Sequence, residues 1–126
     1  MSNQTPTMEQ ILGMMSQKLG GDRNIPDAIK YAKNVAPELI FNIAMSSKDS
    51  VNDENSPFDP KARTLLFLTA ALAMKDGECI KTQLNAALTA SATKEELIAV
   101  IKIVRHAANS SAIGAATPIL KTLAER

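Results

Sequence analysis

The chain has 126 residues, of which 45% are hydrophobic and only 3% aromatic. This length suits one domain, and a core built from Leu, Ile, Ala and Met favours helices over sheets. The 14 Lys and Arg residues against 13 Asp and Glu residues give a net charge of +1. A net charge this close to zero provides no electrostatic footprint for nucleic acid or an anionic membrane, and we expect neither as a partner. The totals predict one all-α domain covering residues 1–126.

Because Cys79 is the single cysteine, the chain cannot form an intramolecular disulfide. A fold that does not depend on disulfides is most consistent with a reducing cytoplasm. Residues 1–7 are polar and lack a basic start followed by an apolar stretch, so we expect no signal peptide. The longest apolar stretch, Leu65 to Met74, is about half the length of a membrane span. We therefore expect a cytoplasmic protein in which this stretch is a buried helix.

Residues 1–46 are expected to form short N-terminal helices. The first runs from about Thr7 to Leu19, where apolar residues recur at helical spacing before Gly20-Gly21 ends it. Pro26 and Pro37 each suit the first position of a further short helix. Residues 47–60 are dense in Ser, Asp, Asn and Pro, so we predict a surface loop there.

Residues 61–126 are expected to form the core hairpin and the C-terminal helices. Asp59 and Pro60 suit the N-cap and first position of a helix that is apolar on nearly every face, which predicts a central place for it. Asp76-Gly77 breaks this pattern, and a new helix begins near Glu78, so the pair forms a helical hairpin.

A capping box at Thr93 and Glu96 predicts the start of a further helix that ends near Ala108. His106 is expected on its outward side, and a separate last segment is expected from Ser110 to Leu123. The predicted inner face of the helix comprises Leu97, Val100, Ile101, Val104 and Ala108.

Cys79 is the main candidate for chemistry. If Asp76 is the N-cap, Cys79 lies in the first helical turn, where unpaired N–H groups and the helix dipole favour a thiolate. The carboxylates of Asp76 and Glu78 oppose this effect, and ordinary packing of a small apolar residue also explains Cys79. Gln83, one turn later on the same face, can hydrogen-bond a ligand or the sulfur but is no general base.

Other reactive sites have little support in the sequence. Arg105 and His106 could bind an anion or transfer a proton, although a solvated helix face explains them more simply. A metal site needs several convergent ligands, which one cysteine and one histidine do not provide. Phosphate-loop, dinucleotide and serine-hydrolase motifs are missing, so we expect no metal and no cofactor.

The order of sequence features from Phe58 onward resembles the carboxymuconolactone decarboxylase family, which includes the alkylhydroperoxidase D-like (AhpD-like) proteins. These features are the start Phe58–Arg63, an apolar helix, a cysteine-bearing turn, a second helix to Leu88, and the helix start Ser91–Leu97. They cover about half of the chain. The resemblance implies an AhpD-like all-α domain built on a central helical hairpin. It also implies a homo-oligomer, a trimer or hexamer, with the site near subunit contacts.

In the peroxidase branch of this family, a glutamate, a C-x-x-C pair and a following histidine form a proton relay and a dithiol. This chain has Thr64 at the glutamate position, Asp76 at the first cysteine and Gln83 at the histidine. Only Cys79 matches. A peroxide-oxidised Cys79 would therefore need a resolving thiol from another molecule.

Three functional hypotheses follow from the resemblance and the residues. The first is a peroxiredoxin-type antioxidant oxidoreductase with Cys79 as catalytic thiol, Gln83 orienting its partner, and Thr64 and Asp76 shaping the pocket near Glu78. The second is a lactone-decarboxylase-like enzyme for a small carboxylated substrate, with Arg63, Arg105 or His106 brought in from other helices or subunits. The third is a non-catalytic oligomeric binding protein whose site has decayed.

Overall fold

The computed structural model describes residues 5–126, and the regular elements within them are all helical, which confirms the predicted fold class. None of the helices in this range has the length and apolar character needed to cross a bilayer. In chain order the elements are α1 (Met8–Leu19), the 3₁₀ turn η1 (Asp22–Asn24), α2 (Asp27–Val35), α3 (Glu38–Lys48), α4 (Pro60–Ala73), α5 (Gly77–Thr89), α6 (Lys94–Ala115) and α7 (Thr117–Ala124).

Helix α1 begins and ends at the residues that the sequence indicates. The Thr7 hydroxyl accepts a hydrogen bond from the Gln10 backbone N–H at 3.1 Å, and the Gln10 side chain accepts one from the Thr7 N–H at 2.9 Å. Gly20 ends the helix with a φ of 86°, a conformation that glycine adopts without steric cost. The polar start from which we expect no signal peptide lies partly outside the described residues, because its first four residues are not included.

Two predicted boundaries in the N-terminal part shift slightly. Pro26 and Pro37 are N-caps of α2 and α3 rather than first helical residues. Helix α3 continues to Lys48, so the surface loop spans residues 49–59. Arg63 ties this loop to α4, because its Nε donates to the Val51 carbonyl and its Nη1 to the Phe58 carbonyl, both at 2.8 Å.

Helix α5 links two hydrophobic clusters. Ala86 belongs to the cluster formed by the N-terminal helices, whose fully buried members include Ile11 and Ile40. Ala87, one residue later, belongs to a second cluster with Leu68 of α4 and Val100 of α6. Successive helical residues point about 100° apart, so α5 can contribute to both clusters through adjacent small side chains.

The expected buried helix, α4, is buried on only one side within the single chain. Thr64, Leu68 and Ala71 form its buried face. The opposite side exposes four apolar residues at helical spacing, namely Leu66, Ala70, Ala73 and Met74. We call these four residues the open face of α4.

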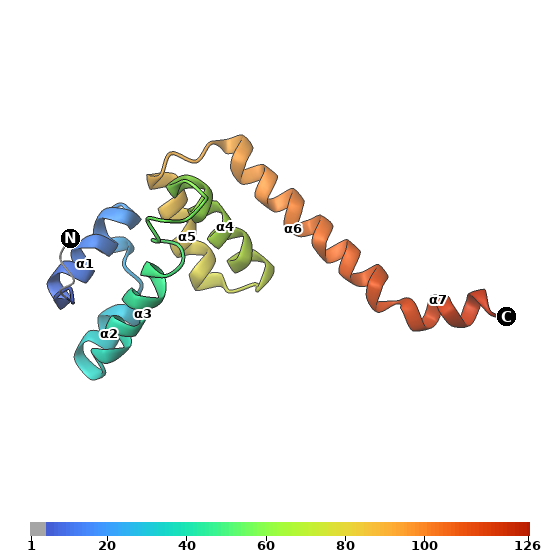
Figure 1. Cartoon of the computed structure of the whole chain (residues 1–126), viewed down its shortest axis with the longest axis horizontal. Coiled ribbons are helices and arrows are strands. Elements are labelled where there is room, and N and C mark those ends of the chain that lie inside the picture. Colours follow the sequence, from blue (N-terminus) through green and yellow to red (C-terminus); the bar gives the residue numbers. More distant parts are fainter. Residues whose placement is uncertain (1–4) are drawn as a thin grey trace.

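Helix α6 is longer than expected, because it continues past Ala108 to Ala115. The separate last segment predicted from Ser110 to Leu123 is therefore reduced to α7. Ala and Ser sustain a helix, and the first proline comes only at position 118. Figure 1 shows α6 and α7 extending away from the other helices, with the C-terminus at the far end. From Ile101 to Arg126 every residue is exposed except Val104 and Ala116. The predicted inner face is therefore covered only at Leu97, Val100 and Val104.

Candidate functional site

A hollow of about 300 Å³ has Cys79 in its wall. This volume is at the lower end of the range of small-molecule pockets. Half of its lining is apolar and comes from α1 to α5 and the segments between them: Met15, Leu19, Pro26, Ile29, Ile43, Val51, Phe67 and Ala86. The polar lining comprises Lys18, Ser47, Asn52, Asp76, Glu78, Cys79, Thr82 and Gln83. We call this hollow the Cys79 pocket.

The turn between α4 and α5 positions Cys79. Lys75 adopts a left-handed conformation, with a φ of 57°, and reverses the chain so that Asp76 can cap α5. The Asp76 Oδ1 accepts a hydrogen bond from the Cys79 backbone N–H at 3.2 Å. Cys79 is therefore in the first turn of α5, as the sequence predicts, and its side chain is partly exposed.

The electrostatic surroundings do not activate the Cys79 thiol within one chain. Burial raises its pKa above the ordinary value, and the negative charge of Asp76 raises it further. The pKa is thus raised although a helix N-terminus by itself favours a thiolate. The sulfur is therefore mainly a protonated thiol near neutral pH.

Gln83 and Glu78 lie in the same pocket, as the sequence predicts for neighbours of Cys79. Gln83 is one helical turn after Cys79 and is half-buried, so its amide can face a bound molecule. Thr82 also lines the pocket, and its hydroxyl donates to the Glu78 carbonyl at 3.0 Å. Asp76, Glu78, Cys79 and Gln83 are thus brought together at the start of α5.

Lys18 of α1 is a pocket residue that the sequence reasoning missed. Burial lowers the pKa of its ammonium group, and the nearby positive charge of Arg63 lowers it further. Within residues 5–126 Lys18 forms no ion pair with a carboxylate. In the sequence, only the position of Lys18 between the apolar residues Met15 and Leu19 could have indicated that Lys18 lines the pocket.

The other predicted site residues are not part of the pocket lining. Thr64 is 2% exposed, and its hydroxyl donates to the Pro60 carbonyl at 3.0 Å. Arg63 uses its guanidinium to hold the loop 49–59. Arg105 and His106 are exposed on the projecting part of α6, as are most residues there.

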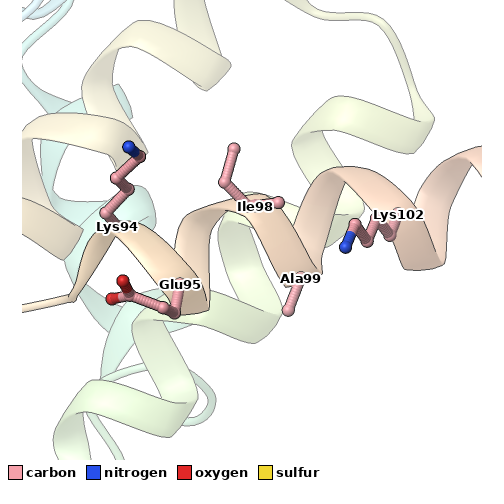
Figure 2. A pocket seen from close by; sticks show the side chains of 5 residues that line it. All are labelled: Lys94, Glu95, Ile98, Ala99 and Lys102. Carbon is pink, nitrogen blue, oxygen red and sulfur yellow. The ribbon is translucent and has the colours of Figure 1, made fainter.

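A second hollow, of about 230 Å³, is less suited to chemistry. Figure 2 shows its five lining side chains, all of which come from the first turns of α6: Lys94, Glu95, Ile98, Ala99 and Lys102. No second element forms a wall, and none of the five is a thiol, hydroxyl or imidazole. The Cys79 pocket is therefore the better candidate site.

Comparison with known proteins identifies the family. The family model "Carboxymuconolactone decarboxylase family" matches residues 43–122, which is more than half of the chain. The chain belongs to the carboxymuconolactone decarboxylase family. No match was found among curated proteins. Family membership supports an AhpD-like or decarboxylase-family protein, as the resemblance implied.

The family match divides the Cys79 pocket into two parts. The matched carboxymuconolactone decarboxylase segment includes the end of α3 and all of α4 and α5, with Cys79 and Gln83. The opposite wall comes from α1 and the start of α2, which precede the matched segment and contribute Lys18 and Ile29. Cys79 is therefore on the hairpin that the family model covers, whereas part of the pocket wall comes from the preceding helices.

Proposed function

We propose that the protein is an AhpD-like thiol peroxidase that reduces small, largely apolar hydroperoxides at Cys79. The observation that carries this proposal is that the chain's sole thiol is in the wall of a small, half-apolar pocket. An apolar hydroperoxide would bury its carbon skeleton against residues such as Ile29, Ile43 and Phe67. Its peroxide group would then be held beside the sulfur, which favours reaction through proximity.

The proposed cycle needs a second thiol from outside the chain. The Cys79 thiolate attacks the terminal oxygen of ROOH, the O–O bond breaks, and ROH leaves after taking up a proton. This leaves Cys79 as a sulfenic acid. An external thiol, R′SH, condenses with it to a mixed disulfide and water, and a second R′SH restores the Cys79 thiol and releases R′SSR′.

The raised pKa of Cys79 limits the expected rate of peroxide reduction. Only the thiolate is nucleophilic, so a mainly protonated thiol reacts slowly near neutral pH and faster as the pH rises. A slow, pH-dependent turnover is therefore the expected behaviour of the single chain.

The test follows consumption of cumene hydroperoxide by wild type and Cys79→Ser in the presence of dithiothreitol. We expect the serine variant to lose at least about 99% of the protein-dependent rate, because a serine hydroxyl is not ionised near neutral pH. Mass spectrometry of wild type treated with peroxide and a sulfenic-acid trap should locate the adduct at Cys79. Equal rates for the two proteins would refute the proposal.

Lys18 favours a lactone-decarboxylase-like enzyme as a second candidate function. Such an enzyme needs an ionisable group in the pocket, and Lys18 provides one besides Asp76 and Glu78. A small carboxylated lactone should then raise the melting temperature of wild type but not of Lys18→Met. Lys33→Met, at an exposed position of α2, is the matched control and should behave as wild type.

The non-catalytic alternative gives a different pattern. If the pocket only binds a ligand, a molecule that stabilises wild type will stabilise Cys79→Ser equally, and neither protein will consume peroxide or convert the lactone. Peroxide consumption, ligand-induced change in melting temperature and conversion of the lactone, measured together, therefore separate the three functions.

A further inference from the structure

Lys18 is a cation of the Cys79 pocket that lacks a carboxylate partner within the described residues. It lines the pocket from α1 and is half-buried. Its ammonium group forms no ion pair within residues 5–126, and the sequence of residues 1–4, Met-Ser-Asn-Gln, contains no acidic side chain. Charged groups that are partly withdrawn from water are usually paired in proteins. An ammonium group without such a partner in a pocket wall is therefore suited to bind an anionic ligand.

Arg63 adds a second positive charge near Lys18. Its charge lowers the pKa of the Lys18 ammonium group, after burial as the larger cause, so the two cations are close enough to repel each other. The guanidinium is held in place, because its Nε donates to the Val51 carbonyl and its Nη1 to the Phe58 carbonyl, both at 2.8 Å. An anion bound to Lys18 would relieve this repulsion, which favours an anionic group at this position.

Two neutral hydrogen-bond donors line the pocket beside the loop that Arg63 holds. Asn52 follows Val51 in this loop, and its backbone N–H donates to the Ser47 carbonyl at 2.7 Å. The side chains of Ser47 and Asn52 both line the Cys79 pocket. A serine hydroxyl and an asparagine amide can each donate to a carboxylate oxygen. The pocket wall formed by α1, the end of α3 and this loop therefore combines a cation with neutral donors.

The wall that carries Cys79 has the opposite charge. Asp76 and Glu78 line the pocket there, and the negative charge of Asp76 acts on the Cys79 thiol, whose pKa it raises. Neither carboxylate forms an ion pair with Lys18. An anionic group is therefore repelled near Cys79 and attracted at Lys18, so the charges orient a ligand that has one anionic end. A hydroperoxide group is uncharged near neutral pH and is compatible with the acidic wall.

We infer that the preferred substrates are hydroperoxides of small carboxylic acids, bound with the carboxylate at Lys18 and the peroxide group at Cys79. This inference rests on the peroxidase function proposed above and names its substrate class. The apolar residues of the pocket, such as Ile29 and Phe67, contact the carbon skeleton. Lys18 determines the specificity for the acid. Because α1 precedes the segment that the family model matches, this specificity comes from a part of the chain outside that segment.

Two hydroperoxides with the same carbon skeleton test this inference, namely cumene hydroperoxide and its para-carboxy derivative. The kcat/KM of the full-length protein is measured for each, with dithiothreitol as reductant, and the ratio of the two values gives the preference for the acid. We expect wild type to prefer the para-carboxy derivative at least about tenfold, as is typical of a hydrogen bond to a charged group. The preference should come mainly from a lower KM, because the carboxylate is remote from the reacting bond and is bound equally in the ground state and the transition state.

Three variants assign this preference to the charge of Lys18. Lys18→Met keeps the length of the side chain but not its charge, and it should lower the ratio of the two kcat/KM values at least about tenfold. Lys18→Arg keeps the charge and should retain most of the preference. Lys33→Met removes the same charge from an exposed position of α2 and should leave the ratio unchanged. Comparing ratios between variants cancels any difference in the intrinsic reactivity of the two peroxides.

Binding of para-isopropylbenzoate, which has no peroxide group, measures the carboxylate site without turnover. It should raise the melting temperature of Cys79→Ser but not that of the double variant Cys79→Ser, Lys18→Met. A ratio of kcat/KM values that Lys18→Met leaves unchanged, or equal stabilisation of these two proteins, overturns the inference. If wild type consumes neither peroxide, the proposed function fails instead, and stabilisation by para-isopropylbenzoate that depends on Lys18 still supports the carboxylate site.

Discussion

The carboxylate of Asp76 acts on Cys79 in two opposing ways. Its Oδ1 accepts a hydrogen bond from the Cys79 backbone N–H at 3.2 Å, which fixes the first turn of α5 and thereby the position of the thiol. Its negative charge also raises the pKa of that thiol, after burial as the larger cause. The residue that positions the candidate nucleophile therefore also keeps it protonated.

The substitution Asp76→Asn separates these two effects. Asparagine is as good an N-cap as aspartate, so α5 should start unchanged, while the negative charge is lost. We expect the pKa of Cys79 to fall towards its ordinary value but to remain elevated by burial. Alkylation by iodoacetamide at pH 7.5 should then be about twofold or more faster than in wild type, because the thiolate fraction is larger.

Asp76→Ala is the matched comparison, because it removes both the charge and the cap. It should accelerate alkylation similarly but lower the free energy of unfolding by about 1 kcal/mol, whereas Asp76→Asn should cost little. If Asp76→Asn alkylates no faster than wild type, the charge of Asp76 does not control the thiol.

The raised pKa of Cys79 predicts a specific pH dependence. A higher pKa in the folded chain means that the thiolate forms at higher pH than in the unfolded chain. The alkylation rate of native protein should therefore reach half of its maximum at higher pH than the rate in urea. Folding also becomes less favourable as the pH rises through the raised pKa, because the folded state retains its proton more strongly. A native midpoint below the unfolded one would show an activated thiolate, as could arise from a neighbouring copy.

Gln83 is the pocket residue that the resemblance matches to the histidine of the peroxidase branch. It lies one turn after Cys79 and lines the same pocket. Gln83→His should therefore increase peroxide reduction about tenfold or more near neutral pH, since a histidine can accept the thiol proton. Lys81→His, on the exposed side of α5, adds the same group away from the pocket and should leave the rate unchanged. Equal rates for the two variants would indicate that Gln83 does not face the sulfur.

Thr64, which the resemblance matches to the glutamate of the peroxidase branch, is a buried residue of α4. Its side chain is 2% exposed, and its hydroxyl is satisfied by the Pro60 carbonyl. Thr64→Glu should lower the free energy of unfolding by about 3 kcal/mol, because it buries a charge without a partner. Thr64→Val keeps the shape and should cost no more than about 1 kcal/mol in the same urea titration. A stable Thr64→Glu would mean that this position opens into a polar cavity.

Local signals in the sequence predicted the helix starts well. Asp59, Asp76 and Thr93 cap helices in the structure as predicted, because a cap depends on side chains within three residues of one another. The end of α6 could not be predicted in this way. Its Ala- and Ser-rich continuation has neither a strong apolar period nor a breaking residue before position 118.

Only the part of the candidate site that depends on residues close together in the sequence could be predicted. Asp76, Glu78, Cys79 and Gln83 are neighbours along one helix, so their spacing alone groups them. Lys18 joins them only because α1 packs against α5, a contact between segments far apart in the sequence. For α4, apolar residues on every side indicate burial without saying whether one chain provides it.

The capping box of α6 allows a test of the hairpin's connection to the following helix. The Glu96 Oε1 accepts hydrogen bonds from the Thr93 N–H at 2.8 Å and lies 3.1 Å from the Lys61 Nζ of α4. The hydrogen bond from the Thr93 backbone and, after it, the bond from Lys61 hold the pKa of Glu96 below its usual range. This lowered pKa stabilises the fold above the unfolded-state pKa of a glutamate, and the effect is lost as the pH falls through the folded value.

Two variants separate the cap from the charge. Thr93→Ala removes the hydroxyl that caps the Glu96 N–H and should lower the free energy of unfolding by about 1 kcal/mol at both pH 7 and pH 3. Glu96→Gln retains the capping geometry, so it should cost less than Thr93→Ala at pH 7 and less still at pH 3. Urea denaturation at the two pH values measures both. A cost of Glu96→Gln that is unchanged by acid would show that the carboxylate charge does not contribute to holding α6 on the hairpin.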